Sequence, residues 1–187
     1  MKRNTSLILS FGLLVLACSL YRVFDGRPWG FAPQIAMALF SGAIIRDKKF
    51  AFLMPLLSML LSDALYQVLY VNGLSSTPGF YGGQATNYAL FLAMTVFGFF
   101  IKNIRVGSVL AASVAAPVFY FLLSNFQVWI GGGGYQRPKT FSGLLQCYVD
   151  GWPFFTGSLM ATVFFSALFF GAWQLMTRRQ QQLSPAN

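Results

Sequence analysis

Long stretches without a charged residue alternate with short basic clusters along this chain of 187 residues. The main uncharged runs are Asn4–Tyr21, Pro28–Ile45, Ala64–Ile101, Val106–Gln136 and Gly151–Thr177. An apolar run of about 18 or more residues without charge is typical of a membrane-spanning helix. The two longest runs can each contain a loop as well. The pattern therefore predicts an all-α membrane protein that crosses the bilayer several times.

Charges and turn residues divide these runs into six expected transmembrane helices. Their expected bounds are Ser6–Val23, Trp29–Ile45, Phe50–Val71, Asn87–Ile101, Val106–Ile130 and Trp152–Met176. Pro153 would stand in the first turn of the sixth helix, where its missing N–H costs little. No polar segment is long enough for a soluble domain, so residues 1–187 are expected to form a single integral membrane domain.

The basic residues predict an orientation for these helices. Most of the 13 Lys and Arg residues fall on one side of the expected spans: Lys2, Arg3, Arg46, Lys48, Lys49, Lys102, Arg105, Arg178 and Arg179. The other side has Arg22, Arg27, Arg137 and Lys139. The positive-inside rule therefore places both termini in the cytoplasm, with the protein in the bacterial inner membrane. The long connections 24–28, 72–86 and 131–151 then lie outside, where a functional site is expected.

Composition and motifs argue against several classes of function. The net charge of +9 is scattered over the span ends, so nucleic-acid binding is not expected. The chain has no histidine, which excludes histidine-ligated haem or zinc and a Ser–His or Cys–His catalytic pair. The glycine run 131–134 lacks the lysine of a phosphate-binding loop. We therefore expect no enzyme, no cofactor and no metal site.

Two features of the chain leave alternatives open. The segment from Lys2 to Leu20 resembles a signal peptide as well as a first transmembrane helix, and residues 15–18 loosely resemble a lipoprotein cleavage site. We adopt the transmembrane helix. Cys18 and Cys147 are both expected near the outer half of the membrane, so a disulfide between them stays an alternative to two free thiols.

Asp63 is an acidic residue inside an expected span. It lies thirteen residues into the third helix, about 20 Å from the cytoplasmic end. A carboxylate at that depth is costly, so it should face the bundle interior with a polar partner such as Ser62 or a tyrosine hydroxyl. Its role is either contact with a ligand or ion, or an internal hydrogen-bond anchor.

Polar side chains also gather near the outer end of the fifth helix. Asn125 and Gln127 can contact a polar ligand or join helices, and Asn125 shares a helix face with Trp129. Aromatic residues nearby would supply apolar walls, as small-molecule sites require. The expected ligand-binding residues are Asp63, Tyr66, Asn125, Gln127, Trp129, Tyr148 and Trp152.

The expected outer loop 131–150 mixes glycines, aromatic residues and cations. Such a loop suits a lid over a bound molecule, and it also suits an ordinary solvated connection. Asp150 can form a surface ion pair with Arg137 or Lys139, which would contribute little to stability.

The second expected helix is rich in small residues. Ala32 and Ala36, and likewise Ala38 and Gly42, are spaced four apart, which allows close helix approach. Internal packing is one interpretation, and docking to a partner subunit is the other.

Several motifs resemble those of an uncharacterised bacterial family of six-span membrane proteins. They are FAPQIAMALFSGA at 31–43, MPLL at 54–57, LSD at 61–63, SNFQVW at 124–129, Tyr135, GLLQCY at 143–148 and PFF at 153–155. The resemblance covers residues 27–172. Its six-span layout is similar to that of the substrate-binding S components of energy-coupling-factor vitamin transporters.

The resemblance implies both termini inside and a vitamin-sized solute bound near the outer face. It also implies a transmembrane coupling subunit with ATPases, docked through small residues on the first helix, where this chain has Ser6 and Ser10. Thr162 stands where an acidic residue is expected in the sixth helix. We therefore expect a capture protein for a small organic solute such as a vitamin or cofactor precursor. A solitary transporter and a non-transporting structural subunit of a larger membrane complex are the alternatives.

Overall fold

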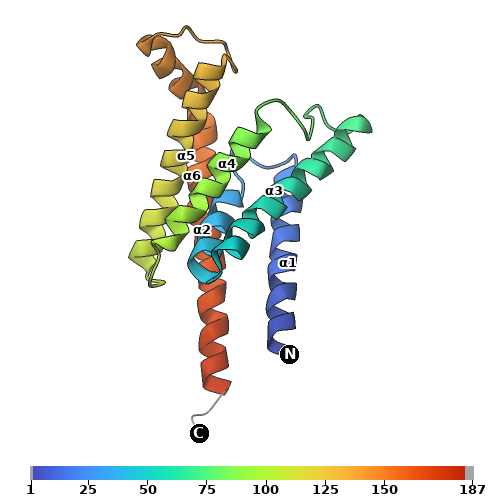
Figure 1. The fold of residues 1–187 in the computed structure, drawn as a ribbon, viewed down its shortest axis with the longest axis vertical. Coiled ribbons are helices and arrows are strands. Elements are labelled where there is room, and N and C mark those ends of the chain that lie inside the picture. Colours follow the sequence, from blue (N-terminus) through green and yellow to red (C-terminus); the bar gives the residue numbers. More distant parts are fainter. Residues whose placement is uncertain (1, 184–187) are drawn as a thin grey trace.

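The protein is all-helical in the part of the chain that the structure describes (Figure 1). A computed structural model describes the backbone of residues 2–183 and the side chains of residues 9–179, so the side chains of Lys2, Arg3 and Ser6 lie outside the described residues. The helices are α1 (Lys2–Val23), α2 (Gln34–Ile44), α3 (Lys48–Val71), α4 (Gln84–Phe99), α5 (Val106–Gly131) and α6 (Phe141–Leu183). Of these, α3, α5 and α6 are long and apolar enough to cross a membrane. This length and composition indicate membrane association.

The second helix is shorter than the sequence predicted. It begins at Gln34 instead of Trp29 and has 11 residues, or about 16 Å, which is well short of a bilayer core. Gly30, with a φ of 72°, directs the chain through a turn, and Pro33 precedes the helix. Helix α4 is also short, with 16 residues, and it starts at Gln84, ahead of the predicted Asn87.

The sixth helix begins eleven residues earlier than predicted, at Phe141 instead of Trp152. Thr140 caps it, since its hydroxyl accepts a hydrogen bond from the Gly143 N–H at 3.2 Å. Pro153 therefore lies inside the helix and does not start it. The predicted loop 131–150 is thus reduced to the connection between α5 and α6, and the rest of that segment is helical.

Helix α2 forms the centre of the bundle and packs against α3, α4, α5 and α6. Its residues from Gln34 to Gly42 are all buried. At its crossing with α4 the backbones touch: a Cβ on Gly42 would lie 2.3 Å from the Thr95 carbonyl oxygen, and one on Gly98 would lie 2.4 Å from the Leu39 oxygen. The small residues therefore serve internal packing. The alternative that α2 docks a partner subunit is wrong, because α2 faces its own chain.

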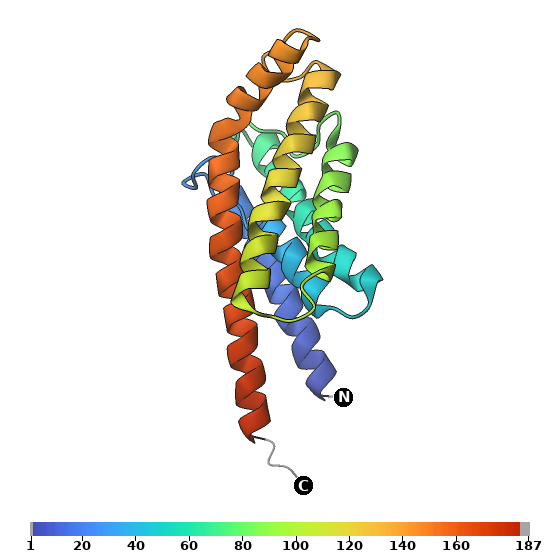
Figure 2. The same cartoon turned by 90° about the vertical axis from the view of Figure 1, so that its left-hand side faces the viewer.

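The two ends of the bundle differ in shape. The start of α1 and the end of α6 lie at one end, and the short turns α2–α3 and α4–α5 point the same way (Figure 1). The connections 24–33, 72–83 and 132–140 lie toward the other end, where the α5–α6 pair projects beyond the remaining helices (Figure 2). We call this second end the loop end.

Candidate binding cavity at the loop end

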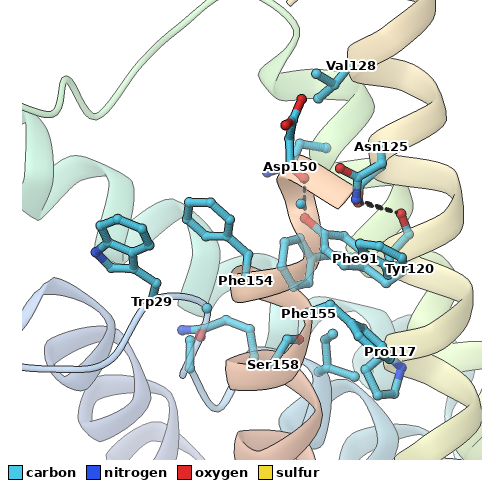
Figure 3. Close-up of a pocket in the computed structure, with 18 of the residues that line it drawn as sticks. Trp29, Phe91, Pro117, Tyr120, Asn125, Val128, Asp150, Phe154, Phe155 and Ser158 are labelled. Atoms are coloured by element: carbon cyan, nitrogen blue, oxygen red, sulfur yellow. Dashed lines mark hydrogen bonds between the residues drawn. The ribbon is translucent and has the colours of Figure 1, made fainter. Parts of the chain in front are cut away.

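A cavity of about 540 Å³ lies near the loop end, between the α1–α2 connection and helices α2, α4, α5 and α6. Seven of the residues that line it are aromatic, and several of them are labelled in Figure 3. The aromatic lining residues are Trp29, Phe91, Tyr120, Phe121, Tyr135, Phe154 and Phe155. The charged and amide side chains in the wall are Arg22, Arg27, Gln34, Asn87, Asn125 and Asp150. This mixture of apolar walls and a few polar groups is typical of a small-molecule site.

The aromatic walls are held in place by close packing of the backbone. The rings of Trp29 and Phe154 stack at 5.5 Å with an angle of 10° between their planes. The α1–α2 connection presses directly on α6, because a Cβ on Gly157 would lie 1.9 Å from the Trp29 carbonyl oxygen. On the opposite wall the ring centroids of Phe91 and Tyr120 lie 4.5 Å apart. The cavity is therefore built by the fold, because ordered elements form both walls.

Gln34 is the most deeply buried polar group in the cavity wall, with 1% of its surface exposed. Its side-chain N–H₂ donates to the Cys18 carbonyl oxygen at 3.2 Å. Its Oε1 is buried and has no hydrogen-bond partner among the described residues. An unpaired buried polar atom costs about 1–3 kcal/mol, so a hydrogen-bond partner for this oxygen would be stabilising.

Asp63 is buried, with 2% exposure, and forms an ion pair with Arg22. Its other carboxylate oxygen accepts from Gln84 Nε2 at 2.6 Å and from the Tyr88 hydroxyl at 2.5 Å. Ser62 accepts from Arg22 at 2.5 Å instead of contacting Asp63. The prediction that Asp63 faces the interior with polar partners is confirmed.

Asp63 does not itself line the cavity, whereas Arg22 does. The carboxylate of Asp63 therefore acts from behind, by holding the Arg22 guanidinium at the wall. Tyr66 has a similar place: its hydroxyl donates to the Arg22 carbonyl oxygen at 2.8 Å and accepts from Arg27 at 3.2 Å. Arg27 also donates to the Arg22 carbonyl oxygen at 2.8 Å. Tyr66 thus orients Arg27 without lining the cavity.

Asn125 and Asp150 complete the polar wall on α5 and α6. The Asn125 side chain donates to the Phe121 carbonyl oxygen at 2.9 Å and packs on Gly151, where a Cβ would lie 2.2 Å from its Oδ1. Asp150 accepts two hydrogen bonds from Arg137, at 2.8 and 2.9 Å. This pairing raises the pKa of the Arg137 guanidinium, which lies in the connection before α6. The predicted pairing of Asp150 with a nearby cation is confirmed.

A family model described as a family of unknown function, DUF6580, matches residues 2–183, which is nearly the whole chain. The chain belongs to this family. No curated protein matches the chain, and no solved structure does either. No activity is assigned to this family.

The other predicted ligand-binding residues lie elsewhere. Gln127 lines a second cavity, which the glycines of the α3–α4 connection also border. The Trp129 indole N–H donates to the Pro138 carbonyl oxygen at 2.8 Å, and the Tyr148 hydroxyl donates to the Leu122 carbonyl oxygen at 3.1 Å. Trp152 packs on Phe121 and remains 57% exposed. Of the seven residues, Asn125 alone lines the main cavity.

The predicted position of the cavity is partly wrong as well. Asp63 and Tyr66, both on the expected third helix, were predicted to contact the ligand, which would place the third helix in the wall of the cavity. No described residue of α3 lines it, because Arg22 and Arg27 stand between α3 and the cavity. From the sequence, Arg22 and Arg27 were interpreted only as signals of membrane orientation. Arg22 lies 41 residues from Asp63 and Arg27 lies 39 residues from Tyr66, so the sequence gave no local sign of these contacts.

The second cavity adjoins the first. Both are lined by Asn87, Tyr120, Ser124 and Val128. The second is also lined by Gly82 and Gly83 of the α3–α4 connection, by Gly131 at the end of α5 and by Gly133 of the α5–α6 connection. Within the residues whose side chains are described, no group of three His, Cys, Asp or Glu residues could hold a metal ion. Cys18 and Cys147 are both free and buried.

Proposed function

We propose that this protein is a membrane-embedded capture or transport protein that binds a small organic solute in the cavity at the loop end. The single observation that carries the proposal is the aromatic cavity of about 540 Å³ whose wall contains a buried, unpartnered Gln34 oxygen. Its size and chemistry suit a vitamin-sized molecule. The resemblance to the S components of energy-coupling-factor transporters agrees with this function, since those proteins bind vitamins near the outer face.

We further propose that all six helices belong to the membrane-embedded body, in the bacterial inner membrane with both termini cytoplasmic. Large apolar side chains are exposed along the outer helices, as lipid contact requires. Examples that follow one face of α1 are Leu9, Leu13, Leu16 and Leu20. The short basic turns α2–α3 and α4–α5 lie toward the same end as the termini, in agreement with the positive-inside rule.

The alternative function, a non-transporting structural subunit, has less support. In this alternative the small residues of the second helix and the basic turns would form the docking surface, and a tightly packed bundle without an outward cavity would favour it. Helix α2 is buried within its own chain, and the loop end contains a cavity. A transmembrane coupling subunit with ATPases is a partner that this proposal allows, and the exposed leucine face of α1 is where it would dock.

Native mass spectrometry of the purified protein tests the capture function. We expect a co-purified small molecule that is lost in Ser158→Trp, because Ser158 lines the cavity and an indole there would fill it. Met160→Trp is the matched control on the same helix, since Met160 is 58% exposed and does not line the cavity. Both variants must be monodisperse. If the wild-type protein carries no small molecule when purified from its own cells, or if Ser158→Trp retains it, the proposal fails.

Labelling of single cysteines tests the orientation. In a background with Cys18→Ala and Cys147→Ala, a membrane-impermeant maleimide added to intact cells should label Lys139→Cys and not Lys48→Cys. Lys139 precedes α6 at the loop end, and Lys48 is the first residue of α3 at the opposite end. Labelling of Lys48→Cys from outside would contradict cytoplasmic termini.

A further inference from the structure

We infer that the cavity at the loop end binds an anionic, planar heterocycle that carries an N–H donor. The inference rests on the proposed function and goes beyond it by naming the chemical class of the solute. Three independent features of the wall carry it: a guanidinium without an acidic partner, opposed aromatic rings, and an unpaired amide oxygen.

The charge of the solute follows from the ion pairs around the cavity. Arg22 is neutralised by Asp63, and Asp150 is neutralised by Arg137. Among the described residues, Arg27 has no carboxylate within ion-pair distance, although it is half-buried and lines the cavity. Its Nε donates to the Arg22 carbonyl oxygen and one terminal nitrogen donates to the Tyr66 hydroxyl, while no described residue accepts from the second terminal nitrogen. A carboxylate or another compact anion would supply the missing charge.

The planar shape follows from the walls. Trp29 and Phe154 form a stacked pair on one side of the cavity, while Phe91, Tyr120 and Phe155 lie on the other (Figure 3). Trp29 and Phe154 are 70% and 53% exposed, so part of the stacked pair is accessible to a further ring. Aromatic pairs prefer offset stacking and edge-to-face contacts, which a flat ring can make with both walls.

The N–H donor follows from Gln34. Its Oε1 is an acceptor, is buried in the wall and has no partner. The N–H₂ group of the same side chain is fixed on the Cys18 carbonyl, which orients the amide. A neutral ring N–H of the solute would pair with Oε1 and remove the cost of leaving it unsatisfied.

A matched series of indoles tests the charge. Indole-3-acetate, indole-3-acetamide and tryptamine share a ring and an N–H and differ in charge. Their binding would be measured by equilibrium dialysis against the full chain in nanodiscs of zwitterionic phosphatidylcholine, with empty nanodiscs subtracted. We expect indole-3-acetate to bind about tenfold more tightly than the amide, and tryptamine to bind more weakly than both.

Variants assign the preference to residues. Arg27→Gln should bind the acetate and the amide with similar affinity, because the counter-ion is gone. Lys139→Gln is the control for general surface charge: it removes a cation at the same end that does not line the cavity, and it should keep the preference. Size-exclusion chromatography checks that both variants are folded.

The N–H donor is tested with 1-methylindole-3-acetate. In the wild-type protein it should bind about tenfold more weakly than indole-3-acetate. In Gln34→Leu the two probes should bind alike, because the acceptor is absent. If 1-methylindole-3-acetate still binds more weakly than indole-3-acetate in Gln34→Leu, the difference in affinity comes from the size of the methyl group and not from a hydrogen bond to Gln34.

Three outcomes overturn the inference: equal binding of the charge series, retention of the anion preference in Arg27→Gln, or no binding of any probe. The proposed function is judged separately by the co-purified molecule and its loss in Ser158→Trp. A co-purified neutral or cationic molecule that depends on the open cavity would leave capture intact and refute the anionic class. If neither a co-purified molecule nor probe binding is found, both proposals fail.

Discussion

The two halves of the bundle differ in how tightly they are packed: the half near the chain termini is close-packed, whereas the half at the loop end contains a cavity. Near the termini, α2 and α4 cross through Gly42 and Gly98 with their backbones in contact. At the loop end the same two helices line a cavity, through Gln34 and Phe91. In the first half, small residues allow the two helices to pack closely. In the second half, large aromatic side chains from α5, α6 and the α1–α2 connection line the cavity. The close contact of α2 with α4 near the termini therefore holds together two of the helices that line the cavity.

The largest expected effect concerns the charge buried behind the cavity wall. Asp63→Leu leaves Arg22 without its counter-ion and should destabilise the protein by about 3–5 kcal/mol, seen as a large drop in melting temperature in detergent. The double variant Arg22→Leu/Asp63→Leu removes both charges and should recover most of that loss. If the double variant is as unstable as Asp63→Leu, the ion pair is not what matters there.

The next effect tests the closed half. Gly42→Ala would place a methyl group 2.3 Å from the Thr95 carbonyl oxygen, so the helices must separate at a cost of about 1–3 kcal/mol. Gly171→Ala in α6 is the control, because a Cβ there meets nothing within 4 Å, and it should be neutral or slightly stabilising. Thermal unfolding of both variants decides, and equal melting temperatures would show that the crossing can relax.

The sequence predicted the closed half better than the open one. The bounds of α3 and α5 were close, since Phe50–Val71 and Val106–Ile130 were expected and the helices are Lys48–Val71 and Val106–Gly131. The basic residues Lys48 and Lys49 of α3, and Arg105 just before α5, marked where these helices begin. The start of α6 was missed because the glycine run was taken as the beginning of a long loop and Pro153 as part of the first helical turn, whereas Thr140 caps a helix that continues through the proline.

The site residues were predicted from their expected depth in the membrane, and this depth does not determine which way a side chain points from its helix. The high cost of exposing a carboxylate to lipid correctly predicted that Asp63 is buried in the bundle. The partner could not be found, because Arg22 and Asp63 are 41 residues apart and meet only through the packing of α1 on α3. Gln127 is two residues from Asn125 and so projects from a different face of α5, into the second cavity.

The smallest expected effect comes from the second ion pair at the loop end, and it sharpens the comparison with the first. Arg137 and Asp150 are paired bidentately, but their side chains are 36% and 22% exposed, against 16% and 2% for Arg22 and Asp63. Water already solvates these charges, so their separation costs little. Arg137→Gln should therefore leave the melting temperature nearly unchanged, and any difference should vanish at 1 M salt because screening weakens exposed pairs. A loss comparable to that of Asp63→Leu would show that the connection 132–140 and the first turns of α6 stabilise the bundle, and that the loop end is not the looser half.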